Sequence, residues 1–433
     1  MNVKKFFGMS TAALLMSVAL VGCGATGGDT TDGGTAESTG KTIKVFQLKV
    51  EINDALVELA KQYEAETGTK VEITSVGGGA DYGAALKAEF AKGESVEPDI
   101  FMVNGAGDIE TWSHKVDDLG SEAWVANAVN GTLDAVTVDG KIQGMPVATE
   151  GYGLIYNKDL FAEAGIDGEA IDTYSELEAA IKTLDSKKAD LGLDNVVSYT
   201  TKETWVTGNH TFNIPFATQE DPKQAVADYI AGSFDVVGNQ NFKDWTNLVE
   251  LLINYGGGAT LETIDYSTQV GNFALGKTAL LHQGNWTAGD MKDLGVDFEM
   301  GILPLAINED TSVSGSIPVG VPMYWSVNKD SSVNAEARAF LDWMVSSETG
   351  QTALVEEMNM IPAFTNFEVT SEDQLAQAVT AYNNDGKTLP WVFTMFPDGF
   401  TMEKVGPIFA KLAKGEIDKT QMLAEIQALT PLN

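Results

Sequence analysis

The stretch that decides the fold is KTIKVFQLKVEINDALVELAKQYEAETGTKVEITS, residues 41–75. Its first part, residues 42–48, is rich in β-branched and aromatic residues and predicts a strand. Apolar residues then recur every three or four positions from Ile52 to Tyr63, which predicts a helix that ends at Gly68. Residues 70–75 alternate in polarity and predict a second strand. A strand, a helix and a second strand make one unit of a parallel α/β sheet.

The same alternation continues along the rest of the chain, and the C-terminal part is mainly helical. Further strands are expected over residues 98–103, 278–282 and 298–304. Further helices are expected over residues 81–92, 174–184, 242–255, 337–345, 375–382, 405–412 and 422–429, together with a short helix through Phe273 and a helix that starts within residues 284–291. This order predicts an α/β fold of two lobes that the chain crosses more than once, with a helical C-terminal region.

The beginning of the chain is typical of a bacterial lipoprotein. Two lysines precede the apolar run of residues 12–21, which is shorter than the ~20 residues of a membrane-spanning helix and fits a signal peptide. The sequence LVGC at residues 20–23 resembles a lipobox, and Cys23 is the only cysteine. We expect residues 1–22 to be the signal peptide, Cys23 to be lipidated, and the polar residues 23–40 to be a flexible linker. The alternative is an ordinary signal peptide with a chance cysteine.

The composition narrows the class of ligand. The formal charge is −35, and it becomes −37 without the two lysines of the signal peptide, so the surface repels nucleic acid. Arg338 is the only arginine among 27 basic residues. Sites for phosphate or carboxylate usually recruit arginine for its bidentate geometry. The sequence therefore favours an uncharged ligand and excludes nucleic acid as a partner.

Polar residues follow the first expected strands. In an open α/β sheet, ligands bind at the carboxyl ends of the strands. The candidates at these ends are Gln47, Lys49, Glu51, Asp81, Tyr82 and Asn104. For Asp81 and Tyr82, a plain helix start is an equally good interpretation.

Three segments resemble a known family. They are DGKIQGMPVATEGYGLIYNKDLFAEAGI at residues 139–166, FALGKTALLHQGNW at residues 273–286 and ARAFLDWMVSSETGQ at residues 337–351. All three resemble the solute-binding proteins of ABC importers, in the carbohydrate-binding group that includes maltose-binding protein. The resemblance implies a two-lobe, type II periplasmic-binding-protein-like fold with hinge crossovers and a ligand held between the lobes.

The resemblance also implies the division into lobes. The first lobe is expected to comprise residues 41–149 and about 305–355. The second lobe is expected to comprise residues of about 150–304 and 356–433.

The site residues that the resemblance implies lie on the hinge strand, at the glycine-x-tryptophan motif and in residues 387–397, where members of the family often present another aromatic residue. Others are chosen from the chemistry of residues 201–216, which no family motif covers. The set consists of Glu150, Tyr152, Asn285, Trp286, Trp391, Trp205, Asn209 and Asn213. Alternatively, the tryptophans pack in the core and Glu150 only braces the hinge. The histidines His114, His210 and His282 show no metal spacing, and we expect structural or surface roles for them.

Aromatic residues suit the C–H faces of a sugar, and carboxylates and amides suit its hydroxyls. We therefore expect a monomeric lipoprotein, without metal or cofactor, on the outer face of the cytoplasmic membrane. It is expected to deliver a neutral mono- or oligosaccharide to ABC permease subunits. The alternatives are a non-sugar solute on the same fold and an extracellular enzyme that acts on glycans. Such an enzyme needs two spaced carboxylates, whereas the sequence contains no H-E-x-x-H, G-x-S-x-G or P-loop motif.

Overall fold

A computed structural model describes residues 40–77, 80–94 and 96–432. The expected signal peptide, Cys23 and nearly all of the expected linker lie outside the described residues. The described residues belong to one compact unit, which contains two main β-sheets, each with its own hydrophobic core. In the described part of the chain, no helix has the length and apolar character needed to cross a membrane.

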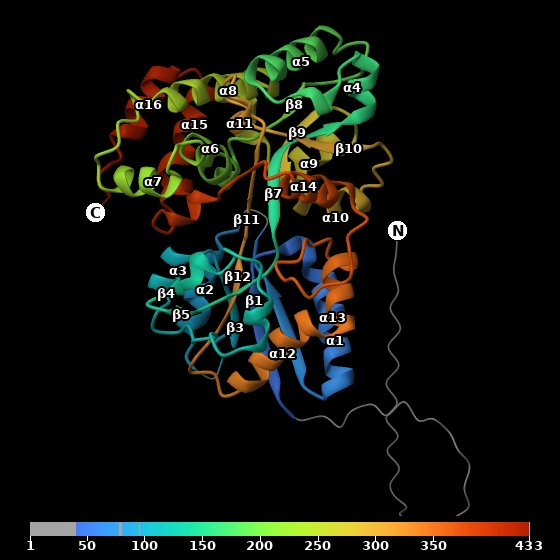
Figure 1. Ribbon diagram of the computed structural model, residues 1–433, viewed down its shortest axis with the longest axis vertical. Coiled ribbons are helices and arrows are strands. Elements are labelled where there is room, and N and C mark those ends of the chain that lie inside the picture. Colours follow the sequence, from blue (N-terminus) through green and yellow to red (C-terminus); the bar gives the residue numbers. More distant parts are fainter. Residues whose placement is uncertain (1–39, 78–79, 95, 433) are drawn as a thin grey trace, which may run out of the picture. The chain divides into compact units, whose positions relative to one another are not determined.

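The first lobe is built on a five-stranded sheet (Figure 1). Its strand order is β2 (Lys70–Ser75), β1 (Thr42–Gln47), β3 (Ile100–Val103), β12 (Tyr324–Val327) and β6 (Met145–Pro146). Strands β1, β2 and β3 are parallel, and β12 is antiparallel to both of its neighbours. A separate hairpin joins β4 (Thr137–Val138) to β5 (Lys141–Ile142). The helices of this lobe are α1 (Asn53–Thr67), α2 (Tyr82–Phe90), α3 (Ala106–Thr111), α12 (Asn334–Ser346) and α13 (Glu348–Thr352).

Helix α1 shows how the sequence pattern becomes structure. Its periodic apolar residues Leu56, Leu59 and Tyr63 are all buried in the first-lobe core. The helix ends at Gly68, whose φ of 74° is left-handed and whose N–H donates to the carbonyl of Glu64. Glycine tolerates this conformation without a Cβ penalty. The predicted strand–helix–strand unit is therefore confirmed within a residue or two.

The second lobe is built around strand β7 (Glu150–Asn157), which is buried along its whole length. Antiparallel neighbours of β7 are β9 (Leu280–Gly284), β10 (Met300–Leu303) and β11 (Ile317–Gly320). Strand β8 (Val197–Ser198) lies parallel to β9, and β13 (Thr388–Leu389) lies parallel to β11.

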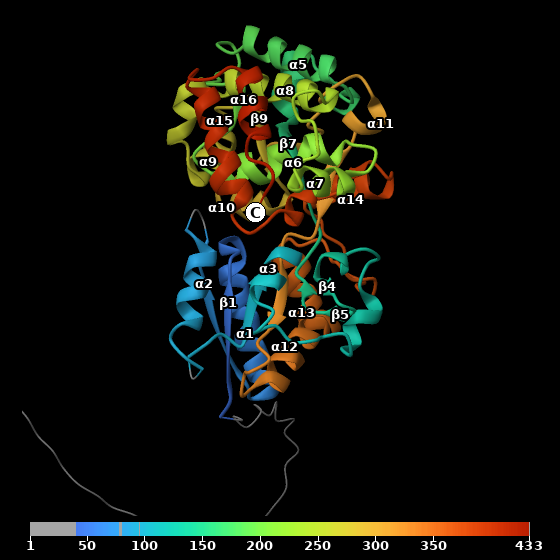
Figure 2. The ribbon, with the colours of Figure 1, turned by 90° about the vertical axis from the view of Figure 1, so that its left-hand side faces the viewer.

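The helices of the second lobe surround this sheet (Figure 2). The expected ones are α5 (Tyr174–Ser186), α8 (Gln240–Gly256), α9 (Tyr266–Ala274), α10 (Ala288–Asp293), α14 (Gln374–Asn384), α15 (Gly406–Ala413) and α16 (Lys419–Gln427). Four short helices were not predicted, namely α4 (Lys158–Ala164), α6 (Phe212–Ala217), α7 (Pro222–Ile230) and α11 (Thr311–Ser314).

The chain returns to the first lobe later than the sequence suggested. Residues 305–307 are buried in the second-lobe core, and β11 pairs with β7. The passage therefore falls between β11 and β12, after residue 320 and not near 305. Met358, Met360, Ala363 and Phe364 still pack in the first-lobe core, so the prediction that the second lobe resumes at 356 is also wrong. Both errors have one cause, because pairing with β7 and packing in the first-lobe core depend on residues that are distant in the sequence.

Candidate functional site

Six rings gather on the second lobe where β7 begins, and we call them the aromatic cluster. They belong to Tyr152, Trp205, His210, Trp286, Trp391 and Phe393. Contacting ring centroids lie 4.2 to 6.4 Å apart. Four of these residues were predicted as ligand-binding, and the structure brings all four together.

Two glycines allow the tryptophans to reach the cluster. Gly284 is paired with Tyr152 of β7, and a Cβ on Gly284 would lie 2.3 Å from the Trp286 ring. Gly320 is paired with Glu150, and a Cβ there would lie 2.5 Å from Cγ of Trp391. Both distances are shorter than a van der Waals contact. The strands on each side of β7 thus need glycine so that an indole can lie against the backbone.

The ring nitrogens of the cluster are used unequally. Nε1 of Trp286 donates to Oε1 of Gln283 at 3.0 Å, and Nε1 of Trp205 donates to Oε2 of Glu203 at 3.1 Å. In contrast, the buried Nε1 of Trp391 and Nδ1 of His210 have no hydrogen-bond partner among the described residues. A buried polar group without a partner costs free energy, so these two nitrogens require an explanation.

A buried charged group joins the two lobes beside this cluster. Nζ of Lys49, which follows β1, lies 2.7 Å from Oε1 of Glu150 and 2.6 Å from Oε1 of Glu51. Lys49 is only 7% exposed. Burial by itself lowers the pKa of Lys49, but the two carboxylates outweigh it and the pKa is raised. Lys49 is therefore a cation held by two acids, and Glu150 does brace the hinge.

A further carboxylate completes the surroundings of this charged group. The hydroxyl of Tyr266 donates to Oδ2 of Asp290 at 2.6 Å. Burial raises the pKa of Asp290, Tyr266 opposes this effect, and the negative charge of Glu51 adds to it. Burial is the main cause of the raised pKa of Tyr266, the charge of Asp290 follows, and the charges of Glu51 and Glu150 add to the effect. Tyr266 and Asp290 were not predicted, because nothing in their local sequence pattern distinguishes them.

Several predicted residues have their polar groups occupied within the protein. Asn213 donates to the carbonyl of Pro390 at 3.0 Å and accepts from the backbone N–H groups of Val392 and Phe393 at 2.8 and 3.1 Å. It therefore positions the segment that carries Trp391. Asn285 accepts from the N–H of Gly151 at 2.9 Å, which fixes the start of β7 against the loop that carries Trp286.

On the first lobe, Asp81 and Tyr82 lie at the start of helix α2, as the helix-start interpretation predicted. Asp81 is exposed and caps α2 by accepting from the N–H of Ala84 at 2.8 Å. The hydroxyl of Tyr82 lies 3.1 Å from the carbonyl oxygens of Phe46 and Met102, to either of which it can donate its one hydrogen, and it accepts from the N–H of Met102 at 2.9 Å. Tyr82 thus ties β1 to β3, and this contact raises the stability of the sheet.

Asn104 and Asn209 line one small hollow together, although they belong to different lobes. The hollow has a volume of about 40 Å³ and is also lined by Asp108, Phe393, Asp398 and Thr401. Burial raises the pKa of Asp108 to about 6, and the nearby charge of Asp398 adds to the effect. The hydroxyl of Thr401 donates to Oδ1 of Asn209 at 2.5 Å.

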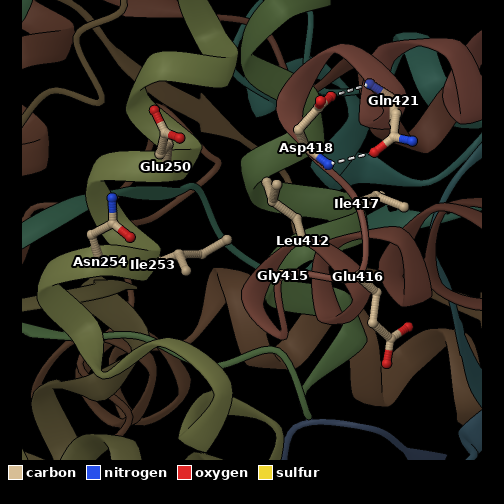
Figure 3. A pocket seen from close by; sticks show the side chains of 9 residues that line it. All are labelled: Glu250, Ile253, Asn254, Leu412, Gly415, Glu416, Ile417, Asp418 and Gln421. Carbon is tan, nitrogen blue, oxygen red and sulfur yellow. Dashed lines mark hydrogen bonds between the residues drawn. The ribbon is translucent and has the colours of Figure 1, made fainter.

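A larger hollow of about 400 Å³ lies elsewhere on the second lobe, between α8 and the loop from α15 to α16 (Figure 3). It contains none of the predicted site residues. Its polar side chains Asp418 and Gln421 are occupied by the capping box of α16, which is drawn in the figure. The candidate site considered below is therefore the aromatic cluster and not this larger hollow.

His210 was expected to be structural or a surface residue, but it contacts every other ring of the cluster. It lies on a π-helical segment, η5 (Val206–Thr211), five residues after Trp205. The sequence did not indicate this turn. In an α-helix, residues five apart point in different directions, whereas a π-helix forms i→i+5 hydrogen bonds.

Comparison with known proteins identifies the family of the chain. The family described as "Bacterial extracellular solute-binding protein" matches residues 58–384, which is most of the chain. The chain belongs to this family. A similar protein from Streptococcus pneumoniae is named a maltooligosaccharide ABC transporter solute-binding lipoprotein. Its sequence is 26% identical to this chain, and the match covers 88% of this chain and 87% of that protein.

Solved structures share the fold of this solute-binding protein. RafE in complex with raffinose has a TM-score of 0.76 at 20% identity, covering 90% of this chain and 98% of that chain. A sugar transporter from Bacillus licheniformis in complex with stachyose has a TM-score of 0.71 at 19% identity, covering 90% and 99%. The two-lobe type II fold is therefore confirmed.

Proposed function

We propose that this solute-binding protein captures a neutral oligosaccharide between its lobes and delivers it to the membrane permease of an ABC importer. The relatives support this proposal, because their names mention maltooligosaccharide, raffinose and stachyose. The observation that carries it is the aromatic cluster beside the group formed by Lys49, Glu51 and Glu150. Rings match the apolar faces of sugars, and the carboxylates accept hydrogen bonds from their hydroxyls.

The charges favour an uncharged sugar. Lys49 is already held by two carboxylates at 2.6 and 2.7 Å. Arg338 lies on α12 and is paired with Asp117 at 2.6 Å and with Glu122. An anionic sugar would therefore meet Glu51, Glu150 and Asp290 without a free guanidinium to neutralise it. Removing a carboxylate from water without a partner costs several kcal/mol.

The proposal includes the lipid anchor and the location of the protein at the outer face of the cytoplasmic membrane. In this proposal Cys23 carries the lipid, residues 24–40 link it to the folded domain, and the folded domain functions as a monomer outside the cytoplasmic membrane. The homologous protein of Streptococcus pneumoniae is named a lipoprotein, which supports the lipobox interpretation. Two acyl chains are needed for stable anchoring.

The alternative functions are separated by one experiment. The purified protein is incubated with raffinose, stachyose, maltotriose and a uronic oligosaccharide, and each mixture is examined by thermal shift and by chromatography. We expect at least one neutral sugar to raise the melting temperature and to be recovered unchanged. Released products would indicate an enzyme. Stabilisation by an amino acid or peptide, with none by sugars, would indicate another solute and refute the proposal.

A further inference from the structure

The unequal use of ring nitrogens suggests a division of roles within the aromatic cluster. Trp205 and Trp286 have their N–H groups bonded to protein side chains, so they offer a ligand only their faces. Trp391 and His210 each keep a buried nitrogen without a partner among the described residues. These two rings therefore have hydrogen-bonding capacity that the protein itself does not use.

His210 is the central member of the cluster. Its ring stacks on Tyr152 with a centroid distance of 4.2 Å and an interplanar angle of 16°. It lies 5.1 Å from Trp286 and 5.3 Å from Trp205, and 5.9 Å from Trp391. The hydroxyl of Tyr152 donates to the backbone carbonyl of His210 at 3.0 Å, which fixes the residue in place.

The imidazole at this position is uncharged. Burial lowers the pKa of His210 well below its usual value, and the neighbouring His282 adds to this effect. A neutral imidazole has one nitrogen that donates and one that accepts. Such a group matches a sugar hydroxyl, which also donates and accepts, and it brings no positive charge that would select an anion.

We propose that His210 contacts the bound saccharide and selects the orientation of one of its hydroxyl groups. This inference rests on the proposed function. Sites that hydrogen-bond a hydroxyl discriminate strongly, because a ligand with the hydroxyl misplaced leaves the buried partner unsatisfied. Trp205 and Trp286 then supply surface, whereas His210 supplies specificity.

A second buried histidine provides the matched control. His282, on β9, also has unpartnered nitrogens, and burial lowers its pKa to about 3. The centroid of the His282 ring lies 6.3 Å from that of Tyr152 and 5.5 Å from that of Tyr199. His282 and His210 are near each other in space. Among the described residues, however, the ring of His282 contacts none of the tryptophan rings of the cluster. We therefore expect an effect on ligand specificity from His210 but not from His282.

The test uses His210→Phe, which keeps a ring but removes both nitrogens, and His282→Phe as the control. Affinities for raffinose, stachyose and maltotriose are measured by calorimetry. We expect His210→Phe to weaken the best wild-type ligand about tenfold or more and to bring the three affinities closer together. His282→Phe should keep the wild-type order of affinities. His210→Asn, which restores a polar atom near the Nδ1 position, should regain part of the loss.

A spectroscopic measurement covers the case in which His210→Phe does not fold. The chain has three histidines, so imidazole ¹⁵N signals of the wild-type protein are few and can be assigned. Saturating sugar should shift the His210 signals more than those of His114 and His282. The inference about His210 would be overturned, and the proposed function left intact, if the His210 signals did not change on binding. The same would hold if the affinities of His210→Phe for all three sugars stayed within twofold of the wild-type values. Absence of binding by the wild-type protein would overturn the proposed function as well.

Discussion

Removal of the Lys49 ammonium gives a prediction whose size follows from the structure. The ammonium lies 2.7 Å from Glu150 and 2.6 Å from Glu51, and Glu150 is 5% exposed. Lys49→Met leaves a buried carboxylate without its counter-ion. Removing one partner of a buried pair typically costs about 3–5 kcal/mol. We expect the free energy of unfolding, measured by urea denaturation, to fall by about that amount.

Two further variants show whether the missing counter-ion is the cause. Lys70→Met breaks an ion pair with Glu72 of the same 2.7 Å length, but both side chains are exposed, so water and salt screen the pair and stability should change little. The double variant Lys49→Met with Glu150→Gln removes the unpaired charge, and it should recover part of the stability that the single variant loses.

The pH dependence gives an independent check on the Lys49 variant. Burial raises the pKa of Glu150, and Lys49 opposes this effect in the wild-type protein. Without Lys49, the folded-state pKa is raised further above the unfolded value. The native state then binds more protons, so the destabilisation should grow as the pH rises above about 4.3 and shrink on acidification. A variant as stable as wild type at pH 8, or one that loses stability only in acid, would refute this reasoning.

The remaining predictions concern the cluster, the backbone beside it and the tether. Trp286→Ala should weaken sugar binding measured by calorimetry by about thirtyfold or more, since a central aromatic anchor commonly contributes about 2 kcal/mol; normal binding with a lowered melting temperature would show that Trp286 is only core. Gly320→Ala should displace Trp391, whose Cγ would lie 2.5 Å from the new Cβ, and should reduce affinity. Gly271→Ala, where the new Cβ has open space, serves as its control and should leave affinity unchanged. Cys23→Ala should abolish incorporation of radioactive palmitate in cells, and persistent labelling would contradict the lipobox interpretation.

The sequence was most informative where structure depends on neighbours in the chain. The helix from Asn53 to Thr67 could be located because its apolar spacing and terminal Gly68 are local signals. The roles of Asn213 and Asn285 could not be predicted, because their partners lie more than a hundred residues away. An asparagine looks the same in sequence whether its amide holds a loop or a ligand.

The resemblance supplied the cluster that local patterns could not. Tyr152, Trp286 and Trp391 are far apart in the chain, and only the pairing of β7 with β9 and β11 brings them together. His210 was not predicted to bind ligand, because its position beside the other rings depends on a π-helical turn. Among the cluster residues, Tyr152, Trp286 and Trp391 were therefore found by resemblance, Trp205 was chosen from the chemistry of its segment, and His210 and Phe393 were not predicted to bind ligand.

The most direct measurement is a calorimetric titration of the wild-type protein with neutral and anionic oligosaccharides at about 20 and 500 mM salt. A neutral ligand has no charge to screen. We expect at least one neutral oligosaccharide to bind with a dissociation constant that changes less than about twofold between the two salt concentrations. Tight binding of a sialic or uronic acid that weakens steeply with salt, and that is lost in Lys49→Ala, would contradict the account.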